Sequence, residues 1–179
     1  MTFKRELFQE DHSAIPQDDV FLFHENYQNQ KGESEQFLRQ ILKEHFNLEN
    51  FILERTKTGK PFIQGGPHFN LSHSHNKIVL AVSLNGSVGV DIEYIRPRPK
   101  FQKLMQRHFT KEEQEFVGDS LEKFYDLWTQ KEALVKCLGK SILSTEFKHH
   151  GQINTSYHPI KAENFKGCVC FSHYTKDPI

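Results

Sequence analysis

The sequence lacks any long hydrophobic run. No stretch approaches the ~20 consecutive apolar residues that a membrane-spanning helix needs. Near Met1 there is also no positively charged start followed by an apolar segment, which is the pattern of a secretory signal. These absences predict a cytoplasmic protein with no membrane partner.

The sequence also lacks an excess of charge of either sign. It has 23 Lys and Arg residues against 23 Asp and Glu residues, so the chain as a whole is not attracted to nucleic acid. Charge is nevertheless uneven along the chain. A basic strip with no acidic residue lies between Glu93 and Glu112 and consists of Arg96, Arg98, Lys100, Lys103, Arg107 and Lys111. Such a strip suits a phosphate-rich substrate or an acidic protein partner, and it is also typical of a solvated linker and helix face.

Cysteine is scarce, with three residues in the chain. Cys168 and Cys170 are separated by one residue and have no second pair, so they lack the usual ligand spacing of a zinc site. Cys137 falls within a predicted helix. This odd number of cysteines predicts reduced thiols that pack as small apolar groups.

The apolar pattern predicts both helices and strands. Apolar residues recur at helical spacing between residues 33 and 46, and Asn47 can end that helix. Two apolar runs at residues 78–84 and 87–93 flank Asn85-Gly86, a dipeptide that favours a two-residue hairpin turn. The other predicted elements are strands at residues 20–24, 51–55, 61–64 and 164–173 and helices at residues 101–108, 111–117 and 121–138.

The grouping of these strands and helices favours an α+β fold over a parallel α/β sheet. The segment RPRPK at residues 96–100 cannot continue a strand, because proline has no backbone N–H to donate. We expect this segment to link an N-terminal half to a C-terminal half. A chain of 179 residues can bury a sizeable core, either as one compact domain or as two halves that share a core.

One candidate for chemistry is the stretch VGVDIE at residues 88–93. Strand side chains alternate between faces, so Asp91 and Glu93 point to the same side. Alternate acids on a strand more often belong to a solvated face, but the apolar residues between them predict that the opposite face is buried. Gly89 removes a side chain beside the acids, as a closely approaching ligand would require.

The second candidate is WTQKEALVK at residues 128–136. At helical spacing Trp128, Glu132 and Lys136 share one face. Taken alone, Glu132 with Lys136 is an ordinary pair on an exposed helix. If this helix packs against the strand that carries Asp91, however, three carboxylates lie beside one lysine. Oxygen ligands of this kind hold hard cations, above all Mg²⁺.

Three further residues have both a chemical and a structural interpretation. Glu113 fits a capping box with Thr110 at the start of a helix, yet it can also act as an acid or base. His73 lies in the sequence SHSH after a predicted strand, where it can bind an anion or serve as a turn histidine. Lys60 follows Gly59 in a predicted turn, where surface lysines are common.

Five motifs occur together in one order. They are GKP at residues 59–61, FNLSHS at 69–74, VGVDIE at 88–93, RHFTKEE at 107–113 and WTQKEALVK at 128–136. Their order and approximate spacing resemble those of the 4′-phosphopantetheinyl transferases, of the surfactin-synthetase-activating type. Any one motif is weak evidence, but five in order are a specific signal.

The resemblance implies a fold and an activity. The fold would consist of two similar small α+β halves that form a pseudo-dimer within one chain, residues 1–95 and 96–179, with the active site at their interface. The activity would be the transfer of 4′-phosphopantetheine from coenzyme A to a serine of an apo acyl or peptidyl carrier protein, with release of adenosine 3′,5′-bisphosphate. A monomer is expected, because the two halves pair with each other.

The resemblance also implies roles for individual residues. The expected magnesium ligands are Asp91, Glu93 and Glu132, the expected coenzyme A contacts are Thr58, Gly59, Lys60, Ser72, His73 and Lys136, and the expected catalytic residues are Glu132, Lys136 and Glu113. Either Glu113 or Glu132 would take the proton of the carrier serine, and sequence does not choose between them. The segment that holds the 3′-phosphate in relatives has no clear match here, so Lys31 and Arg39 are candidates.

The same residues are compatible with two other functions. A metal-dependent phosphodiesterase or nuclease can use such acids and a lysine to activate water, although the neutral total charge and the SHS sequence at residues 72–74 argue against it. A non-catalytic coenzyme A or carrier-binding module would keep the fold without the chemistry, and the intact acids argue against that. The sequence does not specify which carrier protein is used.

Overall fold

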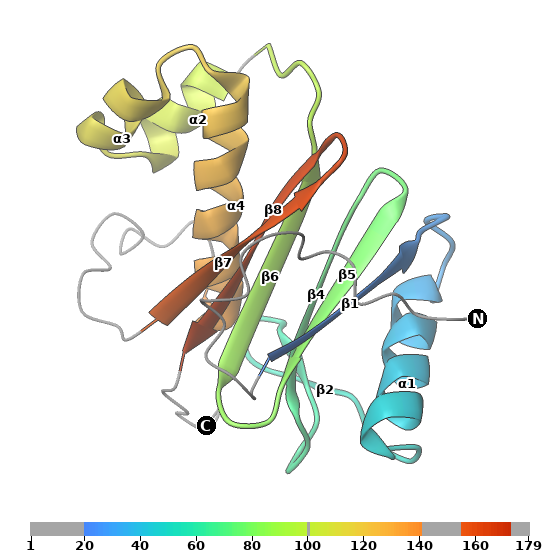
Figure 1. The fold of residues 1–179 in the computed structure, drawn as a ribbon. Helices are drawn as coiled ribbons and strands as arrows, with labels where there is room; N and C mark the ends of the chain where they lie inside the picture. The colour runs from blue at the N-terminus through green and yellow to red at the C-terminus, as the bar shows by residue number, and fades with distance from the viewer. Residues whose placement is uncertain (1–19, 100, 141–154, 173–179) are drawn as a thin grey trace.

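The computed structural model describes residues 20–99, 101–140 and 155–172 (Figure 1). The elements in this part of the chain are β1 (Val20–Asn26), α1 (Glu33–Phe46), β2 (Glu54–Arg55), β3 (Pro61–Phe62), β4 (His68–Ser74), β5 (Lys77–Ser83), β6 (Ser87–Tyr94), α2 (Phe101–His108), α3 (Lys111–Val117), α4 (Leu121–Cys137), β7 (Thr155–Ala162) and β8 (Phe165–Ser172). All four helices begin and end within one residue of the predicted bounds. Residue 100 of the predicted linker and residue 173 of the last predicted strand lie outside the described residues.

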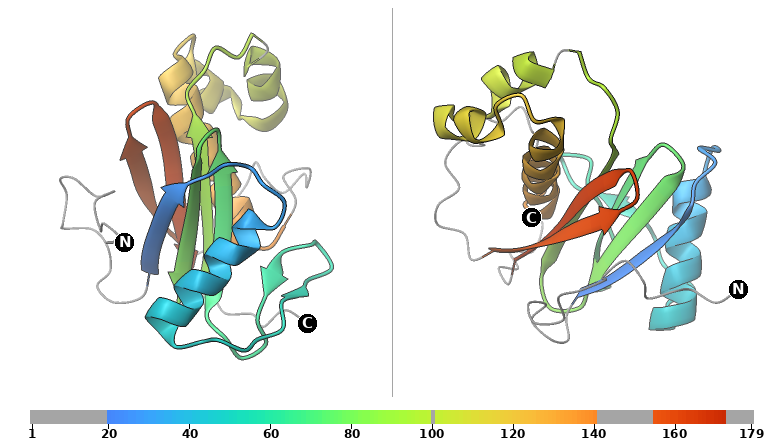
Figure 2. Two further views of the ribbon diagram at one scale, coloured as in Figure 1. Left: turned by 90° about the vertical axis from the view of Figure 1, so that its right-hand side faces the viewer. Right: turned by 45° about the horizontal axis from the view of Figure 1, so that its top comes forward.

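The elements are arranged in four layers, with α1 and α4 on the outside and two sheets between them (Figure 2). Strands β1, β5 and β4 form one antiparallel sheet in that order, and β6, β8 and β7 form the other. Strands β2 and β3 form a separate short ribbon. The two sheets meet where β4 lies beside β6. The described residues therefore form mixed α and β structure, as predicted.

Helix α1 packs on the outer face of the first sheet. Its buried residues are Phe37, Leu38, Ile41 and Leu42, and they share one core with β4 and β5. This is the apolar stripe that the spacing predicted. The helix ends at Asn47, whose φ of 54° is left-handed and whose N–H donates to the Leu42 carbonyl. Asparagine tolerates this conformation better than most residues.

Strand β5 is buried on both faces because it lies between α1 and the second sheet. Ile78 and Leu80 belong to the core beneath α1, whereas Val79 and Ala81 belong to the core between the sheets. A strand covered on both sides needs apolar residues at every position. This explains the continuous apolar run in the sequence.

The predicted hairpin of residues 78–84 with 87–93 is wrong. Both strands exist, but β5 has β1 and β4 at its two edges, and β6 pairs with β8 in the other sheet. Gly86 is needed for space, because a Cβ there would lie 2.4 Å from the Ser172 carbonyl oxygen. The hairpin is instead formed by β4 and β5, around a turn in which His75 has a φ of 55°.

Helix α4 packs on the outer face of the second sheet, over Gly89. A Cβ at Gly89 would lie 2.1 Å from the Ala133 carbonyl oxygen and 2.3 Å from the Cys137 amide nitrogen. The prediction that Gly89 makes room for a ligand is therefore wrong, because the helix backbone fills that space. The close approach brings the acids of β6 next to the polar face of α4.

The three cysteines are free and buried, as predicted, and all lie in the core beneath α4. Among the described residues, no helix combines the length and apolar character that crossing a bilayer requires.

We expect Gly89→Ala to lower the free energy of unfolding by about 3 kcal/mol, because neither β6 nor the α4 backbone can move without losing its packing. Urea denaturation followed by circular dichroism measures this. The matched control is Gly65→Ala, which meets no atom within 4 Å but has a φ of +67°, and which should cost about 1 kcal/mol. Equal losses in the two variants would contradict the packing argument.

Candidate active site

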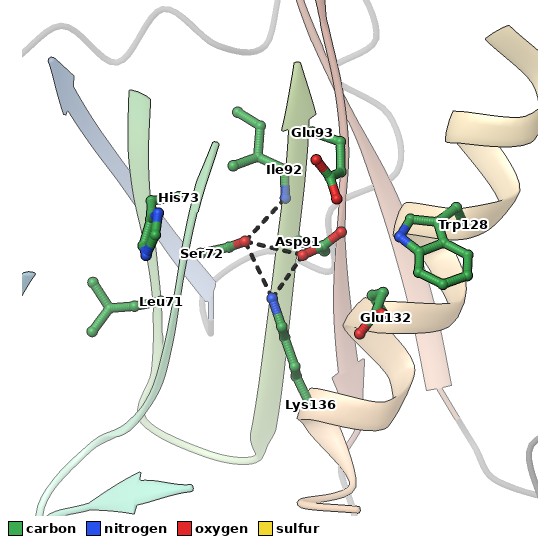
Figure 3. A pocket seen from close by; sticks show the side chains of 9 residues that line it. All are labelled: Leu71, Ser72, His73, Asp91, Ile92, Glu93, Trp128, Glu132 and Lys136. Atoms are coloured by element: carbon green, nitrogen blue, oxygen red, sulfur yellow. Dashed lines mark hydrogen bonds and ion pairs between the residues drawn. The ribbon is translucent and has the colours of Figure 1, made fainter. Parts of the chain in front are cut away.

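A pocket of about 320 Å³ lies where β4, β6 and α4 meet (Figure 3). Its lining residues are Leu71, Ser72, His73, Asp91, Ile92, Glu93, Trp128, Glu132 and Lys136. The strand contributes two acids and the helix contributes one acid and one lysine, as the alternation and the helical spacing predicted. Six residues that the sequence singled out thus lie around one cavity, although they come from three elements.

The strands β4 and β6 are joined by side chains rather than by backbone pairing. Alternate residues of β4 are polar and face the edge of β6 that points away from β8. The backbone N–H of Val90 donates to Asn70 Oδ1 at 2.9 Å, that of Ile92 to Ser72 Oγ at 3.3 Å, and that of Tyr94 to Ser74 Oγ at 3.0 Å. We call this set of three contacts the seam. It satisfies N–H groups of an edge strand that would otherwise be buried without partners.

Asp91 is the most buried acid of the pocket, with 5% of its surface exposed. Its Oδ1 accepts hydrogen bonds from Lys136 Nζ at 2.7 Å and from Ser72 Oγ at 3.0 Å. Its Oδ2 is buried and accepts none from the described residues. Burial raises the pKa of Asp91, and the contacts with Lys136 and Ser72 oppose that rise.

Glu93 and Glu132 face the same pocket from β6 and α4. Burial and then the charge of Asp91 raise the pKa of Glu93, while a hydrogen bond from Ser74 at 3.0 Å opposes this. The same two causes, in the same order, raise the pKa of Glu132 to about 7. The three carboxylates therefore repel one another, and a cation placed among them would relieve that repulsion.

The acids do not form a closed metal-binding set. Within the described residues, no three carboxylate, imidazole or thiol groups are gathered closely enough to hold a metal ion together. Lys136 takes the position beside Asp91 Oδ1, and its Nζ also donates to the Val90 carbonyl oxygen at 3.2 Å. The structure brings the three expected ligands to one pocket, but it does not bring their oxygens to a common point.

Thr58, Gly59 and Lys60 lie outside this pocket, at the C-terminal end of α4. Thr58 Oγ1 donates to the Gly139 carbonyl oxygen at 2.7 Å. Lys60 Nζ donates to the carbonyl oxygens of Val88 and Cys137 at 3.1 and 3.2 Å. Burial lowers the pKa of Lys60. Residues 60–69 line a second pocket of about 340 Å³, so this segment borders a cavity of its own.

Glu113 forms the capping box that the sequence predicted. Its Oε2 accepts the Thr110 N–H at 2.7 Å, and Thr110 Oγ1 accepts the Glu113 N–H at 3.2 Å. Its Oε1 forms an ion pair with Lys131 Nζ at 2.7 Å. Both carboxylate oxygens are therefore engaged, and Glu113 is not among the residues that line the pocket.

His73 belongs to β4, so of its two interpretations the one as a turn histidine is wrong. The pairing of β4 with β5 continues through Ser74, opposite Lys77. The His73 ring lies against Tyr27 at 4.6 Å between ring centroids, and the residue lines the pocket. The turn residue is His75, whose ring stacks on Tyr94 at 4.5 Å.

Comparison with known proteins identifies the family. A family model described as the 4′-phosphopantetheinyl transferase superfamily matches residues 87–175, a span that includes β6 and α4. The chain belongs to the 4′-phosphopantetheinyl transferase superfamily. The family that the motifs indicated is thereby confirmed, and three of the five motifs lie within the matched span.

Individual members of the superfamily are similar to this chain over part of their length. The transferase AcpT of Escherichia coli strain K12 is 37% identical over 110 residues, which are 57% of this chain and 55% of AcpT. The transferase psf-1 of Bacillus pumilus is 38% identical over 117 residues, which are 60% of this chain and 49% of psf-1. The transferase HetI of Nostoc is 33% identical over 121 residues, which are 61% of this chain and 51% of HetI. The chain thus spans about half the length of the curated relatives it matches.

Four residues that shape the site were not predicted from the sequence. Asn70 and Ser74 belong to the seam, and Trp128 was placed on the helix face without a role. Arg98 was assigned only to the basic strip, but its guanidinium lies 5.8 Å from the centroid of the Trp128 ring, and its charge opposes the effect of burial on Glu132. The alternation of polar residues in FNLSHS was the one available signal, because a strand with a polar face needs a partner for it.

We expect Glu132→Gln to stabilise the fold at high pH. The pKa of Glu132 rises from its usual 4.5 to about 7 on folding. Protonation of Glu132 therefore contributes its full stability below pH 4.5, and this contribution is lost as the pH rises through about 7. At pH 8 the variant should gain about 1 kcal/mol after allowance for solvent screening, and far less at pH 5.

Urea denaturation at the two pH values measures this difference. The control Glu115→Gln removes an exposed carboxylate of α3 and should show no such pH dependence. A Glu132→Gln variant that is less stable than the parent at pH 8 would mean that the three acids do not repel one another as described.

Proposed function

We propose that the protein transfers 4′-phosphopantetheine from coenzyme A to a serine of an apo acyl or peptidyl carrier protein. The observation that carries the proposal is the convergence of Asp91, Glu93, Glu132 and Lys136 on one pocket, in a chain that belongs to this superfamily. The serine oxygen would form a bond to the pantetheine-side phosphorus of coenzyme A. The bond from that phosphorus to the bridging oxygen would break, releasing adenosine 3′,5′-bisphosphate.

The fold would be a pseudo-dimer of two similar halves, residues 1–95 and 96–179, within a monomeric chain. What supports this is that the described residues contain two three-stranded antiparallel sheets, each covered by one long helix, α1 or α4. Strand β6 lies within residues 1–95 but pairs with β8 of the second half, so the two sheets do not coincide with the two halves. The pocket then lies between the two halves, since β4 and β6 come from residues 1–95 and α4 comes from residues 96–179.

Asp91, Glu93 and Glu132 would hold Mg²⁺. Their chemistry fits, because all three supply carboxylate oxygens, Asp91 Oδ2 is buried without a partner, and the pKa of each acid is raised by burial. When bound, the ion would neutralise charge on the diphosphate and on the leaving oxygen. Without it, the pocket contains three acids and one lysine, which is unfavourable for a phosphate anion.

The remaining polar groups would bind the phosphates and the nucleotide. Among the described residues that line the pocket, Lys136 is the one lysine or arginine, and it would contact the reacting phosphate with Ser72 and His73 beside it. Thr58, Gly59 and Lys60 would border the nucleotide, and the second pocket along residues 60–69 is the space that supports this.

Glu132 suits the role of general base better than Glu113 does. It lines the pocket, so its carboxylate is placed beside a serine that enters there. Both oxygens of Glu113 are already engaged by Thr110 and Lys131. We therefore assign to Glu113 the positioning of α3 beside α4, and to Glu132 the removal of the serine proton, directly or through water.

The basic strip would receive the carrier protein. Four of its basic residues are exposed: Arg96 before α2, Lys103 and Arg107 on α2, and Lys111 on α3. Exposed positive charge favours the approach of an acidic partner by steering it electrostatically.

The direct test is incubation with coenzyme A, Mg²⁺ and a panel of apo carrier proteins. We expect at least one carrier to gain the mass of one phosphopantetheine group, as measured by mass spectrometry, and a chelator to prevent the gain. No mass gain with any acyl or peptidyl carrier would contradict the proposal, as would magnesium-dependent cleavage of DNA by the purified protein.

We expect Asp91→Asn to reduce transfer by about 100-fold or more, because it removes one of the charged oxygens that the ion requires. The matched control is Asp126→Asn, which removes an acid of α4 that pairs with Lys166 at 3.0 Å and does not line the pocket. Circular dichroism checks that both variants are folded. Transfer by Asp91→Asn at the rate of the parent would place the site elsewhere.

A further inference from the structure

The free edge of β6 carries the two acids of the pocket. In an antiparallel pair, alternate residues direct their N–H groups away from the partner strand. On β6 these are Val90, Ile92 and Tyr94, and each N–H donates to a side chain of β4 across the seam. The acids occupy the alternate positions, so each acid precedes a residue whose N–H is held by the seam.

The three seam residues differ in what else they do. Asn70 Oδ1 only accepts the Val90 N–H. Ser72 and Ser74 accept an N–H in the same way, but each hydroxyl also donates to a carboxylate. Ser72 Oγ donates to Asp91 Oδ1 at 3.0 Å, and Ser74 Oγ donates to Glu93 Oε2 at 3.0 Å.

A hydroxyl suits this double contact for a chemical reason. It has one proton to donate and lone pairs to accept with. Because an N–H group can only donate and an ionised carboxylate can only accept, the orientation of each hydroxyl is fixed. The serine therefore couples the position of the β6 backbone N–H to the orientation of the carboxylate on the preceding residue.

We propose that Ser74 is a positioning residue that holds the Glu93 carboxylate for the metal ion, an inference that rests on the proposed function. Asp91 is fixed by two groups, Ser72 and Lys136. Among the described residues, the hydrogen bond from Ser74 is the one that holds the Glu93 carboxylate. Without the hydroxyl, the longer Glu93 side chain would be free to leave the pocket, and ordering it would weaken ion binding.

The seam itself supplies the control for this inference. Removing the Asn70 side chain breaks a backbone contact of the seam without touching a carboxylate, whereas Ser74→Ala breaks a backbone contact and frees Glu93. A merely structural role would make the two variants alike. Ser74→Thr retains the hydroxyl and is compatible with a strand, so it should retain the Mn²⁺ affinity that Ser74→Ala loses.

The experiment is titration of the full chain with Mn²⁺, without coenzyme A or carrier, followed by isothermal titration calorimetry. We expect Ser74→Ala to weaken Mn²⁺ binding about 10-fold, and Ser74→Thr and Asn70→Ala to bind within about 3-fold of the parent. Transfer by Ser74→Ala should recover at high Mg²⁺ concentration. If Asn70→Ala does not fold, Ser87→Ala replaces it, since Ser87 Oγ donates to the Cys137 carbonyl oxygen and to no carboxylate.

The inference is overturned if Ser74→Ala binds Mn²⁺ as tightly as the parent does, or if the control variant loses as much affinity for Mn²⁺ as Ser74→Ala does. A parent that does not bind Mn²⁺ also overturns it. The proposed function is judged separately by transfer to carriers. If Mn²⁺ binding depends on Ser74 but no carrier is modified, the inference is supported and the proposed function is contradicted. If a carrier is modified but neither Mn²⁺ binding nor transfer depends on Ser74, the proposed function is supported and the inference is contradicted.

Discussion

The structure depends on how the free edge of β6 is satisfied. Backbone N–H groups that leave water must find other partners, and here the polar side chains of β4 accept them at the seam. Carbonyl oxygens of the same strand accept from lysines, Val88 from Lys60 and Val90 from Lys136. The edge is thus paired with side chains from β4, from α4 and from the turn before β3, and the first two of these meet where the acids emerge.

This arrangement buries three carboxylates at positions where they lower the stability of the fold. Burial raises the pKa of Asp91, Glu93 and Glu132, so their ionised forms are unfavourable in the folded chain at neutral pH. The layers around them offset this cost by burying apolar side chains on both faces of β5 and on the inner face of β6. A site that requires a cation to become neutral is favourable for binding one. The repulsion among the three buried carboxylates therefore both lowers the stability of the fold and supports the proposed function.

Much of the fold could be predicted from local pattern. The stripe of Phe37, Leu38, Ile41 and Leu42 defined α1, and Thr110 with Glu113 defined the start of α3, because spacing and capping act within a few residues. Strand pairing could not be predicted in this way. The dipeptide Asn85-Gly86 is typical of a hairpin, yet β5 and β6 enter different sheets, because both edges of β5 are taken by β1 and β4.

The candidate site, too, could be predicted only in part. The sequence by itself determined that Asp91 and Glu93 share one strand face and that Trp128, Glu132 and Lys136 share one helix face, since those relations follow from the period of each element. Only the tertiary structure decided that the two faces meet, that α4 rather than a ligand fills the space over Gly89, and that Ser74 contacts Glu93. These contacts join residues far apart in the chain, and their distances depend on how whole layers pack, which no local pattern encodes.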